Sequence, residues 1–315
     1  MVHMSKKILF IVNPASRGGK SKILWEEIKV ELLASGLNFD YKYTQKPKDA
    51  IELAKVACES KEYEIIVSFG GDGTVNEVLN GILKANVSKI PSFTIFPSGT
   101  GSDTVRTLGI PKTTPEIIRL LKTNNSHLLD VGEVLYINKE LETSYEKRYF
   151  LNACDIGIGA TVVNTVNQMN QEKTQKNGKA KYFRSIIQQV LKFKPFNGYL
   201  TIDGKNYSIT RTVIIAICNG RFFGGGVKVS PLSKMDDNQL ELVATQNARK
   251  VHLFDIVSKI YRGSHVGHPK VVFHNGKKFA VQLEKPHLLE TDGEVVGLVT
   301  DVEILVAHHK IKVLY

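Results

Sequence analysis

The chain has 315 residues, of which 42% are hydrophobic and 23% are charged, a balance typical of a globular protein of about two domains. Its three cysteines, Cys58, Cys154 and Cys218, are widely spaced and form no CxxC motif, which argues against a disulfide framework or a zinc site and favours a reducing cytosol. The formal net charge of +11 implies an anionic partner, which from charge alone is a nucleotide, a nucleic acid or an acidic membrane surface.

The predicted elements change character along the chain. The apolar run after Lys6 and Lys7 is only about six residues long, too short for a signal peptide or a membrane span. Up to about residue 127, short apolar strands alternate with helical stretches (21–35, 48–60, 75–85 and 114–122), which predicts a parallel α/β sheet. Beyond about 128, strands separated by turn dipeptides predict an antiparallel sandwich, whose one helical exception is a basic stretch from about 171 to 194.

Three strands of the first half end in small and polar residues, at 13–20, 70–74 and 97–103. Ligands of open α/β sheets bind at the carboxyl ends of strands, so these loops are expected to line one crevice. Glycines beside a helix start suit an anion, although Gly-Gly-Asp-Gly-Thr also makes a good turn with no ligand. A Walker A motif is excluded by Pro14, and a dinucleotide fingerprint by Thr104.

Six motifs, in chain order, resemble the diacylglycerol kinase catalytic family, above all its soluble bacterial lipid kinases; sphingosine kinases are more distant relatives. They are NPASRGGK, GGDGTVNEV, PSGTGSD, NGRFFGGGVKVSP, KMDDNQLEL and ETDGE, of which the Gly-Gly-Asp-Gly-Thr segment is shared with NAD kinases. The resemblance implies a Rossmann-like α/β nucleotide-binding domain, similar to that of NAD kinases and phosphofructokinases, plus a larger antiparallel β-sandwich domain. The first domain would span 5–127 with a C-terminal return at about 301–315, and the second, which takes the lipid, 128–300, with the nucleotide between them.

The same resemblance implies ATP and Mg²⁺ as cofactors and gives each loop a role. The nucleotide contacts carried over by motif are Asn13, Ser16, Arg17, Gly18, Gly19, Thr44, Gly70, Gly71, Asp72, Gly73, Thr74, Asn76, Glu77, Gly99 and Thr100. A carboxylate at Asp72, in a loop that receives phosphate, makes chemical sense if Mg²⁺ lies between the two, so Asp72 is also a catalytic candidate. Asp103 and Asp130 are further candidates for metal or network contacts, with ordinary capping as the alternative.

The ETDGE motif supplies the second candidate centre. Asp-Gly between apolar residues is a strong hairpin signal, and both Asp203-Gly204 and Asp292-Gly293 fit it. The resemblance separates them, because it places the family's proton acceptor at Glu294, with Asp292 as its neighbour or substitute. A lipid hydroxyl is a poor nucleophile at neutral pH, so a carboxylate base with direct in-line transfer is expected.

A structural Mg²⁺ turn is implied around Asp237, with the carbonyls of Lys234 and Gln239 as companions. Here Asn238 replaces the usual glycine; because Asn tolerates left-handed geometry, we expect the turn to survive. Ser102 likewise stands where relatives often have Asn.

The basic stretch bears on partners. Its Lys179, Lys181 and Arg184 are expected to touch anionic lipid, with a helix packed on the sandwich as the alternative. The resemblance further implies a diacylglycerol-type substrate, a possible homodimer through the β-domains, no nucleic-acid partner, and a cytoplasmic protein in peripheral membrane contact.

Three functions follow: a lipid kinase that converts diacylglycerol or a related lipid alcohol to phosphatidic acid or its analogue, an NAD kinase-like enzyme, and a lipid-binding protein without catalysis. NGRFFGGGVKVSP and ETDGE favour the first over the second, and the retained Asp72, Asp237, Asp292 and Glu294 favour an enzyme over the third.

Overall fold

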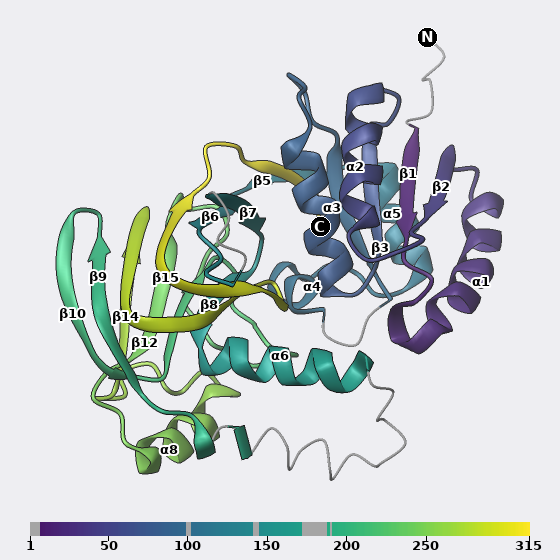
Figure 1. Ribbon diagram of the computed structural model, residues 1–315. Helices are drawn as coiled ribbons and strands as arrows, with labels where there is room; N and C mark the ends of the chain where they lie inside the picture. Colours follow the sequence, from purple (N-terminus) through teal and green to yellow (C-terminus); the bar gives the residue numbers. More distant parts are fainter. Residues whose placement is uncertain (1–6, 99–101, 141–144, 172–187, 190) are drawn as a thin grey trace. The chain divides into compact units, whose positions relative to one another are not determined.

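The computed structural model describes residues 7–98, 102–140, 145–171, 188–189 and 191–315 (Figure 1). The chain divides into two compact units, one made of Met1–Val131 with His308–Tyr315 and the other of Gly132–Ala307. We expected a boundary at 127/128 and a return from about 301. Strand β15 continues to Val306 within the second unit, so the return begins later.

The first unit is built on a six-stranded sheet in the order β2-β1-β3-β4-β16-β5. The first five of these strands are parallel, and β5 is antiparallel to β16. Its strands are β1 (Ile8–Val12), β2 (Phe39–Tyr43), β3 (Ile65–Gly70), β4 (Ser92–Pro97), β5 (Ser126–Leu129) and β16 (Ile311–Leu314). Its helices are η1 (Ser16–Gly19), α1 (Lys20–Ala34), α2 (Asp49–Ser60), α3 (Asp72–Lys84), α4 (Asp103–Leu108) and α5 (Thr114–Thr123).

Aromatic and glycine contacts hold the helices on this sheet. Trp25 of α1 is fully buried, with its ring centroid 5.2 Å from that of Phe10 and 5.3 Å from that of Phe69. On α3, a Cβ at Gly81 would lie 2.2 Å from the carbonyl oxygen of Ile51, so only glycine lets α2 and α3 approach this closely. The packed helices fix the ends of β1, β3 and β4, from which the candidate loops leave.

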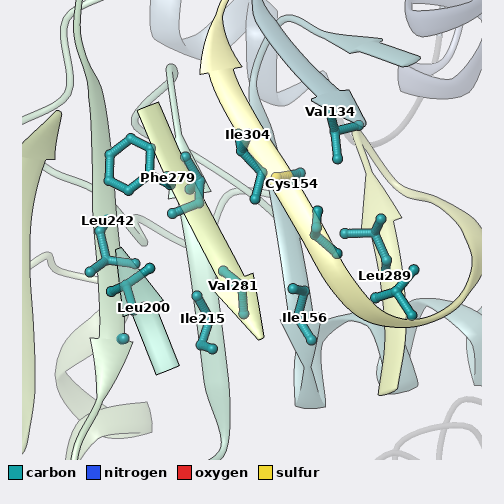
Figure 2. Close-up of a cluster of buried hydrophobic side chains, with 14 of the residues drawn as sticks. Val134, Cys154, Ile156, Leu200, Ile215, Leu242, Phe279, Val281, Leu289 and Ile304 are labelled. Carbon is teal, nitrogen blue, oxygen red and sulfur yellow. The ribbon is translucent and has the colours of Figure 1, made fainter. Parts of the chain in front are cut away.

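The second unit contains a ten-stranded, antiparallel sheet. Its strands are β6 (Gly132–Tyr136), β7 (Glu146–Phe150), β8 (Ala153–Gly157), β9 (Phe196–Ile202), β10 (Lys205–Thr212), β11 (Ile214–Cys218), β12 (Leu240–Thr245), β13 (Val271–Gly276), β14 (Lys278–Thr291) and β15 (Glu294–Val306). Strand β14 pairs with β9 in its first half and with β8 in its last residues, while β15 runs along its other edge. This change of partner curls the sheet around one apolar core, part of which Figure 2 shows.

Two helices of this unit correct the sequence analysis. Helices α6 (Ile158–Gln171) and α8 (Lys250–Ile260) lie where we predicted no helix. Their β-branched valines, threonine and isoleucines resemble strand sequence, and packing against the sheet overrides that local preference. Most of the basic stretch 171–194 lies outside the described residues. Among all the residues that the structure describes, no helix is long and apolar enough to cross a membrane.

Candidate functional site

Side-chain hydrogen bonds join the three predicted loops of the first unit. The Asn13 amide, just after β1, donates from Nδ2 to Thr74 Oγ1 at 2.9 Å. The Asp72 carboxylate, at the start of α3, accepts the backbone N–H of Ser102 at 2.9 Å and that of Asp103 at 3.2 Å. The segments that follow β1, β3 and β4 are therefore brought together, as the parallel sheet led us to expect.

The loop after β1 is open and glycine-dependent. Asn13 Oδ1 accepts the N–H of Ala15 at 3.0 Å, and Ser16 Oγ donates to the carbonyl of Asn13 at 2.9 Å. Gly18 and Gly19 have φ of 67° and 89°, and a Cβ on either would meet nothing within 4 Å. The backbone there is exposed, so an anion can reach its N–H groups without a side chain in the way.

The loop after β3 is tight. A Cβ at Gly70 would lie 2.4 Å from Thr74 Oγ1, so this position must be glycine if Thr74 is to receive the Asn13 amide. Gly71 has extended backbone geometry and precedes α3, and the N-terminus of a helix is a general binding site for phosphate. Gly73 lies in that first turn.

Asp72 and Asp103 form the acidic part of this site. Asp103 is 5% exposed and lies 3.7 Å from Arg106 Nη1, an ion pair within α4 and not the helix cap weighed as its alternative role. Among the described residues, no group of three His, Cys, Asp or Glu side chains is placed to hold a metal. Mg²⁺ in kinases is commonly held by one or two carboxylates with waters and substrate phosphates, and Asp72 with Asp103 fits that pattern.

Glu77 has a structural contact that the sequence did not reveal. Its carboxylate accepts the N–H of Lys48 at 3.0 Å and that of Ala50 at 3.2 Å, at the N-terminus of α2. Asn76 is fully buried, and the Asn80 amide donates to its carbonyl at 2.9 Å. Both contacts are explained without a nucleotide, so nucleotide binding by these two residues stays a prediction.

The other candidates of this unit lie at strand ends. The Thr44 N–H donates to the carbonyl of Val12 at 2.9 Å, just beyond β2. Asp130 is fully buried and pairs with Lys310 Nζ at 2.7 Å, immediately before β16. Gly99 and Thr100 lie outside the described residues.

The two Asp-Gly turns of the second unit have the same backbone and different surroundings. Asp203 and Asp292 have φ of 46° and 47°, and each is followed by a left-handed glycine. Asp203 is exposed and accepts the N–H of Lys278 at 2.9 Å. Asp292 is 7% exposed, and its carboxylate accepts three backbone N–H groups, from Leu151 at 2.8 Å, Asn152 at 2.9 Å and Ala153 at 3.0 Å.

These contacts give Asp292 a structural role that the sequence did not reveal, because its two oxygens bind the connection between β7 and β8. Its role as neighbour or substitute of the base stays a prediction. Glu294 opens β15, and its side chain is 27% exposed and paired with Arg148 Nη2 of β7. The ion pair holds this carboxylate in one orientation. Sequence gave no sign of Arg148, since strand pairing brings it to Glu294 from far along the chain.

A buried carboxyl pair beneath this turn was also missed. Asp155 and Glu290 are register partners on β8 and β14, and both are fully buried. Asp155 Oδ1 accepts the N–H of Ala160 at 3.0 Å, and Glu290 Oε2 accepts that of Gly293 at 2.8 Å. Burial raises the pKa of Asp155 to about 7 and that of Glu290 well above its ordinary value. The pair therefore holds a proton at neutral pH.

The Asp237 turn has the geometry expected of it. Asn238 has φ of 60°, which confirms that asparagine preserves the left-handed turn, and Asp237 Oδ1 accepts the N–H of Gln239 at 3.1 Å. Lys234 and the buried Glu241 line the same small concavity; burial raises the pKa of Glu241, which accepts hydrogen bonds from two serines. Metal binding here stays a prediction. The membrane candidates Lys179, Lys181 and Arg184 lie outside the described residues.

A glycine-rich parallel α/β unit followed by an antiparallel unit with an acidic hairpin is the architecture of a two-domain nucleotide-dependent kinase. Residues 7–134 match the family described as diacylglycerol kinase catalytic domain, and residues 152–314 match the YegS C-terminal NAD kinase beta sandwich-like domain. The chain belongs to the diacylglycerol kinase catalytic-domain family, a family of lipid kinases, as its six motifs predicted.

Individual relatives are consistent with this family assignment. The chain is 26% identical to a diacylglycerol kinase of Staphylococcus carnosus over 93% of its own length and 90% of the relative, and 24% identical to one of Bacillus subtilis over 93% and 91%. A crystal structure of a candidate diacylglycerol kinase from Bacillus anthracis has a TM-score of 0.76 at 27% identity, covering 98% of this chain and 95% of that one. Yeast NADH kinase shares the fold, with a TM-score of 0.55 at 12% identity over 99% and 84%.

Proposed function

We propose that the chain transfers the γ-phosphoryl group of ATP to the hydroxyl of diacylglycerol and produces phosphatidic acid. The observation that carries the proposal is the set of three loops joined through Asn13 and Asp72, in a chain whose relatives are named diacylglycerol kinases. The ends of these parallel strands bring together glycine N–H groups, a helix N-terminus and a carboxylate. Such a set of groups suits a nucleoside triphosphate.

In this proposal the first unit binds the nucleotide. The backbone N–H groups of Arg17 and Gly18 and of residues 71–74 would donate hydrogen bonds to phosphate oxygens, and Asn13 joins the two loops. Asp72 and Asp103 would hold Mg²⁺, which neutralises charge on the phosphate oxygens when bound. Asp72 has a second task, because its two oxygens also fix the start of α4.

The second unit supplies the base. The lipid oxygen forms a bond to the γ-phosphorus as the bond from that phosphorus to the β,γ-bridging oxygen breaks, and ADP leaves. The hydroxyl proton passes to the Glu294 carboxylate. Arg148 is a positioning residue, since it orients that carboxylate before the lipid arrives.

The test is a transfer assay with radiolabelled ATP and Mg²⁺, offered to mixed micelles of diacylglycerol, sphingosine or phosphatidylglycerol and, separately, to soluble NAD. Glu294→Gln is compared with Glu303→Gln, because both glutamates lie on β15 and pair with a basic residue of another strand of the same sheet. We expect label in diacylglycerol, lowered about 10²- to 10⁴-fold by Glu294→Gln and unchanged by Glu303→Gln.

Each other outcome of this assay favours a different conclusion. Label in NAD would favour an NAD kinase-like enzyme, whose fold this chain shares. Label in another lipid would keep the kinase and change its substrate. Equal loss in both glutamine variants would remove Glu294 as the base, and no label in any acceptor would favour a lipid-binding protein.

A further inference from the structure

Helix α8 carries apolar residues on a buried side and on an adjoining exposed side. On the inner side Ile256 is 6% exposed, and Ile260 packs against an apolar cluster that includes Cys218, Phe223 and Val229. On the outer side Phe254, Val257 and Tyr261 are 63%, 52% and 63% exposed. Their i, i+3, i+7 spacing places these three side chains on one face. The inner residues provide the packing of α8 against the core, so core packing does not explain the apolar residues on the outer side.

Two loops extend this outer face. A Cβ at Gly263 would lie 3.0 Å from the side chains of Lys228 and Pro231, and the buried His265 donates from Nε2 to the carbonyl of Val229 at 2.8 Å. These contacts fix the 228–232 loop beside the end of α8. Leu232 and Val266, 60% and 40% exposed, each follow directly on one of these anchored residues, Pro231 and His265, so we include them with the helix face. The α8 patch is Leu232, Phe254, Val257, Tyr261 and Val266.

The surroundings of the α8 patch are basic. Between residues 249 and 270 the sequence has five Lys or Arg residues and a single acidic one, Asp255. Asp255 is already paired with Lys259 at 2.8 Å and lies 3.0 Å from His268 Nε2. Arg262 is exposed next to Tyr261. An apolar centre with a basic rim complements an anionic lipid surface, whereas a second copy of the chain would bring two like-charged rims together.

We propose that the α8 patch docks the chain on anionic bilayers, with Phe254, Val257 and Tyr261 entering the boundary between headgroups and acyl chains and Arg262 lying among the headgroups. The inference rests on the proposed function, since a kinase whose substrate carries two acyl chains meets that substrate at a bilayer. Figure 1 shows α8 at the outer edge of its own unit.

The test is co-sedimentation of the full chain with vesicles of equimolar phosphatidylglycerol and phosphatidylcholine. The double variant Phe254→Ser with Tyr261→Ser is compared with Tyr199→Ser, whose tyrosine is 66% exposed on β9. Removing an aromatic side chain that enters the bilayer weakens partitioning about tenfold or more, so we expect the double variant to lose binding and Tyr199→Ser to bind normally. Arg262→Gln should weaken binding about fivefold on anionic vesicles and leave neutral ones unaffected.

Three results would overturn the inference. The double variant could bind vesicles as well as the parent chain does, or Tyr199→Ser could lose binding as well. The double variant could also keep its vesicle affinity and change from dimer to monomer, which would assign the patch to a second copy. Thermal unfolding of each variant shows that the fold is kept. Phosphorylation of a short-chain diacylglycerol dissolved as monomers reports on the proposed function separately. Absence of that activity with patch-dependent vesicle binding would reject the kinase and keep the docking surface.

Discussion

Replacing Asp155 with asparagine should make the protein more stable at neutral and alkaline pH. The Asp155 carboxyl is fully buried, it accepts the Ala160 N–H at 3.0 Å, and burial raises its pKa to about 7. Asparagine keeps an oxygen for Ala160 and gains an amide that can donate to Glu290. The substitution D155N therefore preserves the hydrogen bonds and removes the charge that the interior disfavours.

The sign follows from proton binding. In the unfolded chain Asp155 loses its proton near pH 4, whereas in the folded chain it keeps it until about pH 7. Between pH 4 and pH 7 the folded state binds more protons than the unfolded state. The contribution of Asp155 to the unfolding free energy is therefore complete below about pH 4 and is lost as the pH rises towards 7. A pKa difference of about three units, at 1.36 kcal/mol each, means that Asp155 lowers the unfolding free energy above pH 7 by at most about 4 kcal/mol. We expect D155N to regain about 2 to 4 kcal/mol of this loss.

The assay is urea unfolding of the parent chain and D155N from pH 4 to pH 8. The difference in unfolding free energy should be close to zero at pH 4 and reach its full value above pH 7. Asp301→Asn, on the exposed side of β15, is the control and should show a difference that does not change with pH. A flat difference for D155N across the same range would refute the shared proton at Asp155 and Glu290.

The remaining predictions concern the other carboxylates and Arg148. Asp292→Ala leaves three buried N–H groups without an acceptor and should lower the unfolding free energy by about 3 to 5 kcal/mol in urea melts, whereas Asp203→Ala, in the exposed hairpin, should cost about 1 kcal/mol. Glu77→Ala removes the cap of α2 and should cost about 1 kcal/mol, with Glu77→Gln costing less; equal losses would argue against capping. Arg148→Gln should lower kcat about tenfold with the KM for ATP unchanged, and a change in KM alone would contradict its positioning role.

The first unit could be predicted from sequence because its signals are local. Apolar runs that end in glycine and polar residues mark parallel strands, and parallel strands bring their carboxyl ends to one edge, so the junction of the three loops followed. The tolerance of a left-handed turn at Asn238 is a property of that residue alone, and φ of 60° agrees with it.

What could not be predicted depends on pairing between distant strands. Arg148 meets Glu294, and Asp155 meets Glu290, only because β7, β8, β14 and β15 adopt one particular register. No periodicity within any of these strands specifies the partner. Helix α8 was missed for another reason: apolar residues on both its faces hide the amphipathic pattern by which a surface helix is found.

The Asp292-Gly293 turn shows how surroundings give a common motif a specific task. A series of contacts runs from this turn into the interior: Gly293 donates to Glu290, Glu290 lies opposite Asp155 in the strand register, and Asp155 accepts from Ala160 at the start of α6. A change in the charge of the pair would therefore be felt at both the hairpin before Glu294 and the first turn of α6. Because the pair is closed to solvent and holds its proton at neutral pH, we expect the hairpin to keep one shape at neutral pH and to loosen as the pair ionises. D155N tests this as well, since the protection factor of its Gly293 amide, relative to global stability, should be the same at pH 6 and at pH 8, whereas that of the parent chain should fall.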